Sequence, residues 1–144
     1  MKVFIENEAG SLEKNIFDEK TLEYKKTNKV SAPYPFPYGF VIGTTSGDGD
    51  NLDCFVLTHQ PIKSRQIIEV EPIGMYEQVE DGEQDNKILA VLKGEGFVID
   101  ENLQNIFREF TSKVFSHKAD KTISVGRFLG VKEAQKLVED CQDK

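Results

Sequence analysis

Apolar and polar residues alternate over short stretches between Met1 and Leu92, a pattern typical of strands that bury one face. Residues 66–78 form the longest such stretch, and Pro72 and Gly74 interrupt it, which predicts a bulge or a corner in the strand. The predicted strands are 1–7, 16–18, 22–24, 40–42, 54–57, 66–78, 88–92 and 122–131, with a short strand end at 97–99.

The spacing of apolar residues changes to three and four after Asp100, which is the period of an amphipathic helix. Asp100 has the right position and side chain to cap this helix at its N-terminus. A second helix is predicted over residues 132–141. The apolar faces are formed by Leu103, Ile106, Phe107, Phe110 and Val114 in the first helix and by Ala134, Leu137, Val138 and Cys141 in the second.

Length and composition predict one domain over residues 1–144, mainly β with flanking helices. The net charge of −7 argues against nucleic acid as a partner, because binding to phosphate backbones needs a basic face. No apolar run reaches the length of a membrane span, so no membrane is expected. Cys54 and Cys141 lack metal-ligand spacing, and a reduced, cytoplasmic setting is the expectation.

Three carboxylates lie close together in the stretch Ser46 to Asp53, namely Asp48, Asp50 and Asp53. At a separation of about 5 Å and an effective dielectric near 20, each like-charged pair costs roughly 3 kcal/mol, so a bound cation is expected. Oxygen ligands favour Mg²⁺, Mn²⁺ or Ca²⁺. An EF-hand is excluded because its glycine position is occupied by Asp53.

A second acidic loop runs over residues 80–87 and leads into the apolar strand 88–92. It contains Glu80, Asp81, Asp85 and Lys87. An acidic loop of this kind is usually exposed to solvent, but its place beside the first acidic loop favours a metal site.

The stretch from Tyr34 to Leu57 resembles the signature of the family I soluble inorganic pyrophosphatases. The family pattern is Tyr-Pro-x-x-Tyr-Gly-aromatic, here Tyr34 to Phe40, followed by Asp-x-Asp-Pro-x-Asp. In this chain Asp48 stands ten residues after Tyr38, which keeps the register of the pattern. Residues 80–91 support the resemblance with an Asp-x-Lys pair.

The resemblance implies a five-stranded, partly open barrel of the OB type with two helices, assembled into homo-oligomers. It implies hydrolysis of inorganic pyrophosphate (EC 3.6.1.1) with several Mg²⁺ ions, for which Mn²⁺ or Zn²⁺ are possible substitutes. Asp50 would take the proton from the attacking water, and Tyr38, the second catalytic residue implied, would direct its hydroxyl toward the phosphate. The implied metal ligands are Asp48, Asp53, Asp85, Glu80 and Glu6, and the implied phosphate-binding residues are Lys14, Lys26, Tyr38 and Lys87, with Tyr34 behind them.

The chain departs from the family pattern at several positions of the site. Ile16 replaces a glutamate, Lys26 replaces an arginine, Asn51 replaces a proline, and Val114-Phe115 replaces a Tyr-Lys pair. Two alternatives therefore stay open: a weakened relative that binds metal or diphosphate as a binding or regulatory subunit, and a hydrolase of another diphosphate. A cation entering the pocket from elsewhere would favour hydrolysis, and apolar side chains there would disfavour it. The candidate cations are Lys113, Lys118 and Arg127.

Overall fold

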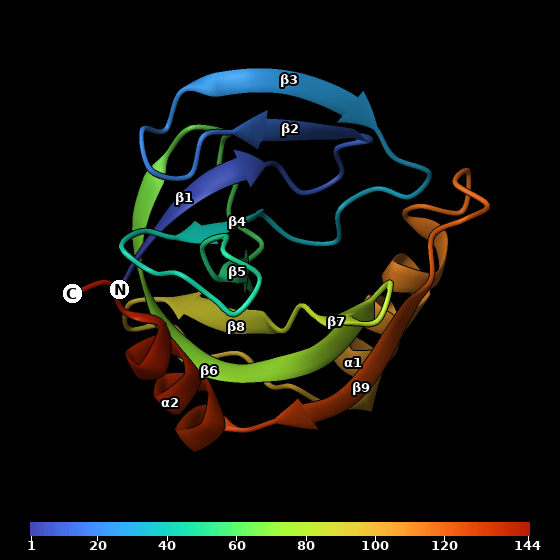
Figure 1. Ribbon diagram of the computed structural model, residues 1–144. Helices are drawn as coiled ribbons and strands as arrows, with labels where there is room; N and C mark the ends of the chain where they lie inside the picture. Colours follow the sequence, from blue (N-terminus) through green and yellow to red (C-terminus); the bar gives the residue numbers. More distant parts are fainter.

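The protein is described by a computed structural model that covers residues 1–144, and it consists of a strongly curved sheet, a separate hairpin and two helices (Figure 1). None of the helices is long and apolar enough to cross a membrane. The sheet contains β1 (Lys2–Asn7), β4 (Tyr38–Val41), β5 (Asp53–Val56), β6 (Ile67–Glu80), β7 (Glu83–Gln84), β8 (Lys87–Leu92) and β9 (Ile123–Leu129). The hairpin contains β2 (Glu13–Phe17) and β3 (Tyr24–Lys29), and the helices are α1 (Glu101–Lys113) and α2 (Val131–Cys141).

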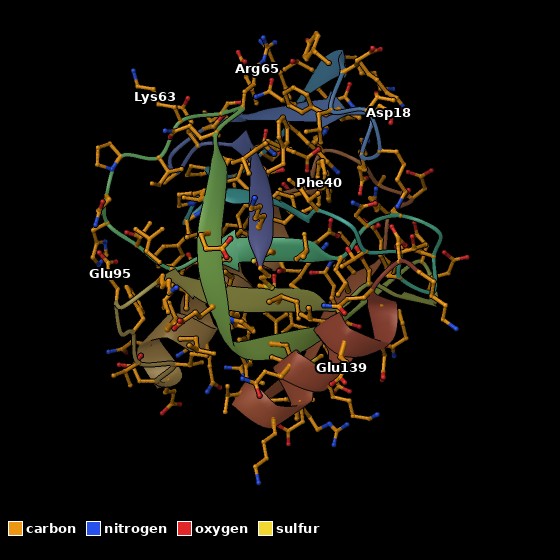
Figure 2. The ribbon with its side chains drawn as sticks, turned by 90° about the vertical axis from the view of Figure 1, so that its left-hand side faces the viewer. Asp18, Phe40, Lys63, Arg65, Glu95 and Glu139 are labelled. Atoms are coloured by element: carbon orange, nitrogen blue, oxygen red, sulfur yellow. The ribbon has the colours of Figure 1, made fainter.

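The sheet closes partly on itself because the long strand β6 pairs at both ends. Its first residues pair with β1, its middle pairs with β8, and its last residues pair with β9. The pairings therefore form a circuit of five strands, β1, β4, β5, β8 and β6, which Figure 2 shows from the side of β6. The register of β6 against β8 shifts between Pro72 and Gly74, which confirms the predicted irregularity.

One glycine lets two strands approach closely beside the site. Gly39 lies in β4 opposite Ile5 of β1, and a Cβ atom built there would lie 1.8 Å from the carbonyl oxygen of Phe4. No side chain fits at this distance, so the contact between β1 and β4 requires glycine. The next residue before it, Tyr38, is thereby held against the pocket.

Two apolar clusters stabilise the sheet from its two sides. The inner cluster contains Tyr38, Phe55 and Tyr76 and packs against Leu103 and Phe107 of α1. The second cluster lies beneath α2, where Ala134 and Val138 are buried against strands β1, β5, β6 and β8. The structure confirms the fold class predicted from the sequence, which is mainly β with two helices.

Several boundaries differ from the sequence predictions. The strands predicted at 16–18 and 22–24 are longer and shifted, since Leu22 has a positive φ of 65° and lies in the turn between them. Residues 97–99 form no strand, but Phe97 and Ile99 pack against the inner cluster. The capping role of Asp100 is confirmed, because its side chain accepts a hydrogen bond from the N–H of Leu103.

Candidate active site

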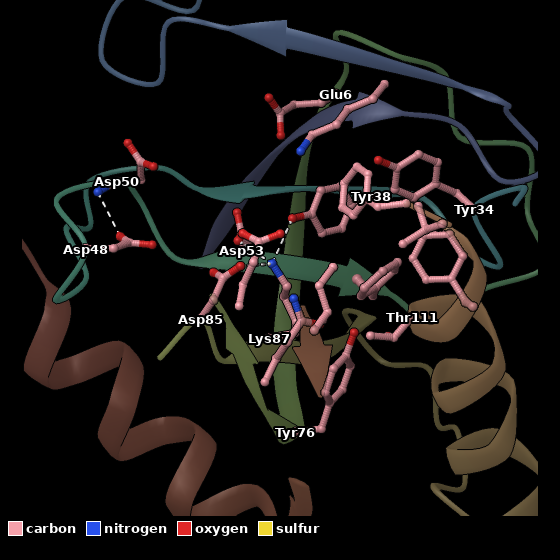
Figure 3. Close-up of a pocket in the computed structure, with 18 of the residues that line it drawn as sticks. Glu6, Tyr34, Tyr38, Asp48, Asp50, Asp53, Tyr76, Asp85, Lys87 and Thr111 are labelled. Atoms are coloured by element: carbon pink, nitrogen blue, oxygen red, sulfur yellow. Dashed lines mark hydrogen bonds and ion pairs between the residues drawn. The ribbon is translucent and has the colours of Figure 1, made fainter. Parts of the chain in front are cut away.

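A cavity of about 260 Å³ opens between the two acidic loops, the hairpin and the end of α1 (Figure 3). Nearly all the residues that the sequence singles out for the site line this cavity, and they come from β1, β2, β4, β5, β6, β8 and the loops between them. Seven carboxylates and two lysines are among the lining residues: Glu6, Glu19, Asp48, Asp50, Asp53, Glu80, Asp85, Lys14 and Lys87.

Lys87 lies at the centre of the cavity and holds two acidic residues together. Its ammonium lies 2.6 Å from a carboxylate oxygen of Asp53 and 3.0 Å from one of Asp85. It also donates a 3.2 Å hydrogen bond to the hydroxyl of Tyr38 (Figure 3). The parallel pairing of β5 and β8 sets this arrangement, because it places Asp53 directly opposite Lys87.

Burial and the shared ammonium determine the charges of this group. Burial raises the pKa of Asp53 to about 6, against the pull of Lys87. Burial also acts to raise the pKa of Asp85, but Lys87 outweighs it and holds that pKa below its usual value. Burial acts to lower the pKa of Lys87, and Asp53 with Asp85 hold it well above its usual value. A lysine cation and an Asp85 carboxylate are therefore the stable forms at neutral pH.

The first acidic loop presents two carboxylates from an exposed turn. The Asp48 carboxylate accepts hydrogen bonds from the Ser46 hydroxyl and, at 2.9 Å, from the N–H of Asp50. Gly49 has a φ of 90°, a left-handed conformation that glycine adopts without strain. The turn brings Asp48 and Asp50 into the same cavity as Asp53.

Glu6 is a buried carboxylate without a cation in direct contact. Burial raises its pKa to about 8, and the nearby charges of Asp53 and Glu19 add to the effect. Lys14 lies near enough to oppose this shift, but burial lowers the pKa of Lys14 as well, with Lys87 adding repulsion. A divalent cation would relieve the repulsion around Glu6.

Glu19 is a pocket residue that the sequence reasoning missed. It lies in the turn between β2 and β3, and its carboxylate accepts a 2.9 Å hydrogen bond from the N–H of Asn51. Burial, with Asp53 and Asp50 nearby, raises the pKa of Glu19 to about 7. No motif or periodicity in the sequence marks this residue, because its place depends on the contact between the hairpin turn and the acidic loop.

Tyrosines form the floor of the cavity. Tyr38 is buried, its hydroxyl accepts from Lys87, and Tyr34 stacks against it with ring centroids 5.4 Å apart. Burial raises the pKa of Tyr38 well above its usual value, so its hydroxyl keeps its proton and can donate a hydrogen bond. The side chain therefore offers the kind of contact that the resemblance implies.

The wall opposite the acidic loops is apolar. It contains Phe110, Val114, Phe115 and Ile123, together with Ile16. None of the three cations considered as replacements lines the cavity. Lys113 pairs with Glu109, Arg127 pairs with Glu77, and Lys118 is exposed.

Among the metal ligands and phosphate-binding residues implied by the resemblance, only Lys26 lies away from the cavity, since it is exposed on β3 outside the lining. Lys121, which the sequence reasoning also missed, lies beside the wall. Its ammonium is 3.3 Å from Glu80 and 4.4 Å from the centroid of the Phe115 ring.

The donor set suits a hard divalent cation. The lining contains carboxylates but neither cysteine nor histidine, and oxygen ligands alone favour ions such as Mg²⁺ over zinc. Counted at full ionisation, seven carboxylates and two lysines leave a charge of −5. In the structure no three of these side chains lie close enough together to bind one ion. Their oxygen ligands and their negative charge nevertheless fit divalent cations.

Known proteins resemble this chain, some of them over nearly all of its length. The model of the inorganic pyrophosphatase family matches residues 3–144. An inorganic pyrophosphatase of Nanoarchaeum equitans is 31% identical over 97% of this chain and 94% of its own length. One from Synechocystis is 40% identical, over 63% of this chain and 55% of its own length.

Solved structures agree with these sequence matches. The inorganic pyrophosphatase of Neisseria gonorrhoeae superposes with a TM-score of 0.89 at 26% identity, covering 98% of this chain and 88% of that one. That of Coxiella burnetii gives a TM-score of 0.87 at 25% identity, with 98% and 92% covered. Because the family model matches residues 3–144, the chain belongs to the inorganic pyrophosphatase family.

Proposed function

We propose that this protein hydrolyses inorganic pyrophosphate to two phosphates and needs divalent cations, preferably Mg²⁺, to do so. The family of the chain supports the reaction. The observation that carries the proposal is the acidic lining of the cavity, whose charge is −5 when all seven carboxylates and both lysines are ionised. A polyanion cannot enter such a cavity unless cations neutralise the carboxylates first.

The acidic residues form the cation side of the proposed site. Asp48, Asp53 and Asp85 would hold the ions, with Glu80 and Glu6 as further members of the cage. When bound, divalent cations neutralise the phosphate oxygens and lower the pKa of water.

Asp50 is the proposed general base. Its carboxylate is exposed at the mouth of the cavity and has no cation in contact, so it is free to accept a proton from the attacking water. Asp53 is less suited to this role, because Lys87 occupies one of its oxygens at 2.6 Å.

Lys14, Lys87 and Tyr38 form the proposed phosphate side. The two ammonium groups and the protonated hydroxyl can donate hydrogen bonds to an anion. They would therefore hold the phosphate oxygens and stabilise the negative charge that develops during phosphoryl transfer. Lys26 remains a proposal from the resemblance alone, as do homo-oligomeric assembly and a cytoplasmic location.

A second candidate function follows from the apolar wall. Phe110, Phe115 and Ile123 are half-buried and offer nothing to an inorganic anion. They would pack against an apolar group, so a diphosphate carrying an organic substituent is the alternative substrate.

The test is phosphate release from pyrophosphate with Mg²⁺ at neutral pH, run beside a diphosphate ester with a hydrocarbon chain. Turnover of pyrophosphate that Asp50→Asn and Asp53→Asn both abolish supports the proposed function. Turnover of the ester alone favours the second candidate. Calorimetry with Mg²⁺ on the inactive variants separates loss of chemistry from loss of cations. If the wild-type protein binds cations but turns over neither substrate, the result favours the alternative that it is a binding or regulatory subunit.

A further inference from the structure

The apolar wall of the cavity leaves the phosphate side short of cations. The lining supplies only Lys14 and Lys87, and the ammonium of Lys87 already contacts Asp53 and Asp85. Beyond the proposed divalent cations, a substrate with several negative charges would bind more tightly if a further lysine or arginine lay beside the lining residues.

Lys121 brings such a cation to the edge of the wall. It lies in the segment between α1 and β9, and its side chain is only 23% exposed. Its ammonium contacts two residues that line the cavity, Glu80 at 3.3 Å and the ring of Phe115 at 4.4 Å from the centroid. A cation over an aromatic face is held by the ring's quadrupole, so Phe115 fixes this ammonium without neutralising it.

The same ring also holds Lys14. The Lys14 ammonium lies 5.1 Å from the Phe115 centroid and that of Lys118 lies 5.6 Å from it. Lys14 and Lys121 are therefore at most about 9.5 Å apart, the limit set by their two distances to one centroid. Of the three lysines around the ring, only Lys121 forms an ion pair, so the cluster has an excess of positive charge that a bound anion would balance.

We propose that Lys121 is a phosphate-binding residue of this site, and that the Phe115 ring positions its ammonium together with that of Lys14. The inference rests on the proposed function for the identity of the anion. Lys121 binds the phosphate oxygens from the wall side, while the carboxylate cage with its cations binds them from the other side. Lysine suits this role as a compact charge on a flexible stem that can move from Glu80 to the phosphate.

The experiment compares Lys121→Ala with Lys118→Ala as a matched control. Both lysines lie over the same ring and in the same segment, but Lys118 is exposed and pairs with no carboxylate. Binding of imidodiphosphate, an analogue with a nitrogen bridge, is measured by calorimetry with Mg²⁺ present, and KM and kcat are measured for pyrophosphate. We expect Lys121→Ala to weaken analogue binding and raise KM by about tenfold or more, as expected for a lost hydrogen bond to a charged group. Lys118→Ala should change both by less than about twofold.

A third variant, Phe115→Leu, tests the positioning role. It should weaken analogue binding more when Lys121 is present than when Lys121 is already alanine, because in the double variant the ring acts through Lys14 alone. Equal effects of Lys121→Ala and Lys118→Ala would overturn the proposal, and so would a wild-type protein that binds no imidodiphosphate. A wild-type protein that binds the analogue but releases no phosphate would overturn the proposed function, while the comparison of the lysine variants would still decide the role of Lys121.

Discussion

The backbone N–H of Asn51 donates a 2.9 Å hydrogen bond to the carboxylate of Glu19, and this bond joins the β2–β3 turn to the first acidic loop. The Asn51 amide side chain strengthens the junction with bonds to the carbonyl oxygens of Val41 and Glu19 and from the Lys20 ammonium. Family members usually carry a proline at this position, which has no N–H to donate. The asparagine therefore makes possible an additional carboxylate at the pocket, in a chain where Ile16 stands in place of a glutamate.

Asn51→Pro should loosen Glu19 and weaken the binding of Mg²⁺. The proline removes both the N–H and the side-chain bonds, so Asn51→Ala, which keeps the N–H, is the matched control. We expect both variants to lose about 1–3 kcal/mol of unfolding free energy, the usual cost of buried polar groups without partners. Only the proline should also lower Mg²⁺ affinity in calorimetry, by about threefold to tenfold. Equal Mg²⁺ affinity in the two variants would show that Glu19 plays no part in cation binding.

Lys87→Met should destabilise the protein strongly. The substitution keeps the volume but leaves Asp53 and Asp85 without the ammonium that contacts both. Removing one partner of a buried ion pair typically costs about 3–5 kcal/mol. Urea unfolding at pH 7 measures the loss, and added Mg²⁺ should recover part of it. Lys113→Met removes an exposed pair with Glu109 and should change stability by less than about 0.5 kcal/mol. A Lys87→Met protein as stable as wild type would mean that its two aspartates take up protons instead.

The sheet strands and helices could be predicted because they bury one face. The sequence shows the apolar face of the first helix, from Leu103 to Val114, as apolar residues spaced three and four apart. It shows the strands as alternating apolar and polar residues. Strand β3 has the sequence Tyr-Lys-Lys-Thr-Asn-Lys and is almost wholly exposed, so no apolar pattern marks its bounds. Its pairing with β2 forms it instead.

The site could be predicted where its residues lie near one another in the sequence. Asp48, Asp50 and Asp53 belong to one loop, and Asp85 and Lys87 to another. Glu19 reaches the cavity through its contact with Asn51, and Lys121 reaches the edge of the cavity through its contacts with Phe115 and Glu80. Such contacts between turns leave no periodic signal in the sequence.

The stability of the cation-free protein should fall as the pH rises. Glu6 has an ordinary pKa of 4.5 in the unfolded chain and a pKa of about 8 in the folded protein. Between pH 4.5 and about pH 8 the folded state holds a proton that the unfolded state has released. Raising the pH through this range therefore lowers the free energy of unfolding.

We expect unfolding free energy in EDTA to decrease by on the order of 2 kcal/mol between about pH 5.5 and pH 8. Glu19, with a pKa raised to about 7, contributes in the same direction. Glu6→Gln should flatten the dependence, since an amide does not titrate, and saturating Mg²⁺ should restore stability at pH 8. Stability that rises over this range in EDTA would contradict the assignment of a buried, unpaired carboxyl group at Glu6.

Gly39→Ala should prevent β1 and β4 from pairing as they do. The added methyl group would lie 1.8 Å from the carbonyl oxygen of Phe4 and 3.1 Å from the Cα of Ile5, both backbone atoms that cannot rotate away. The strands must then separate, which moves Tyr38 at the cavity floor and breaks ladder bonds. We expect a loss of at least about 3 kcal/mol, or protein that does not fold, measured by urea unfolding. Gly47→Ala is the control, because no atom lies within 4 Å of its added Cβ, and it should unfold within about 0.5 kcal/mol of wild type. A Gly39→Ala protein with unchanged stability would show that the two strands lie farther apart than the structure places them.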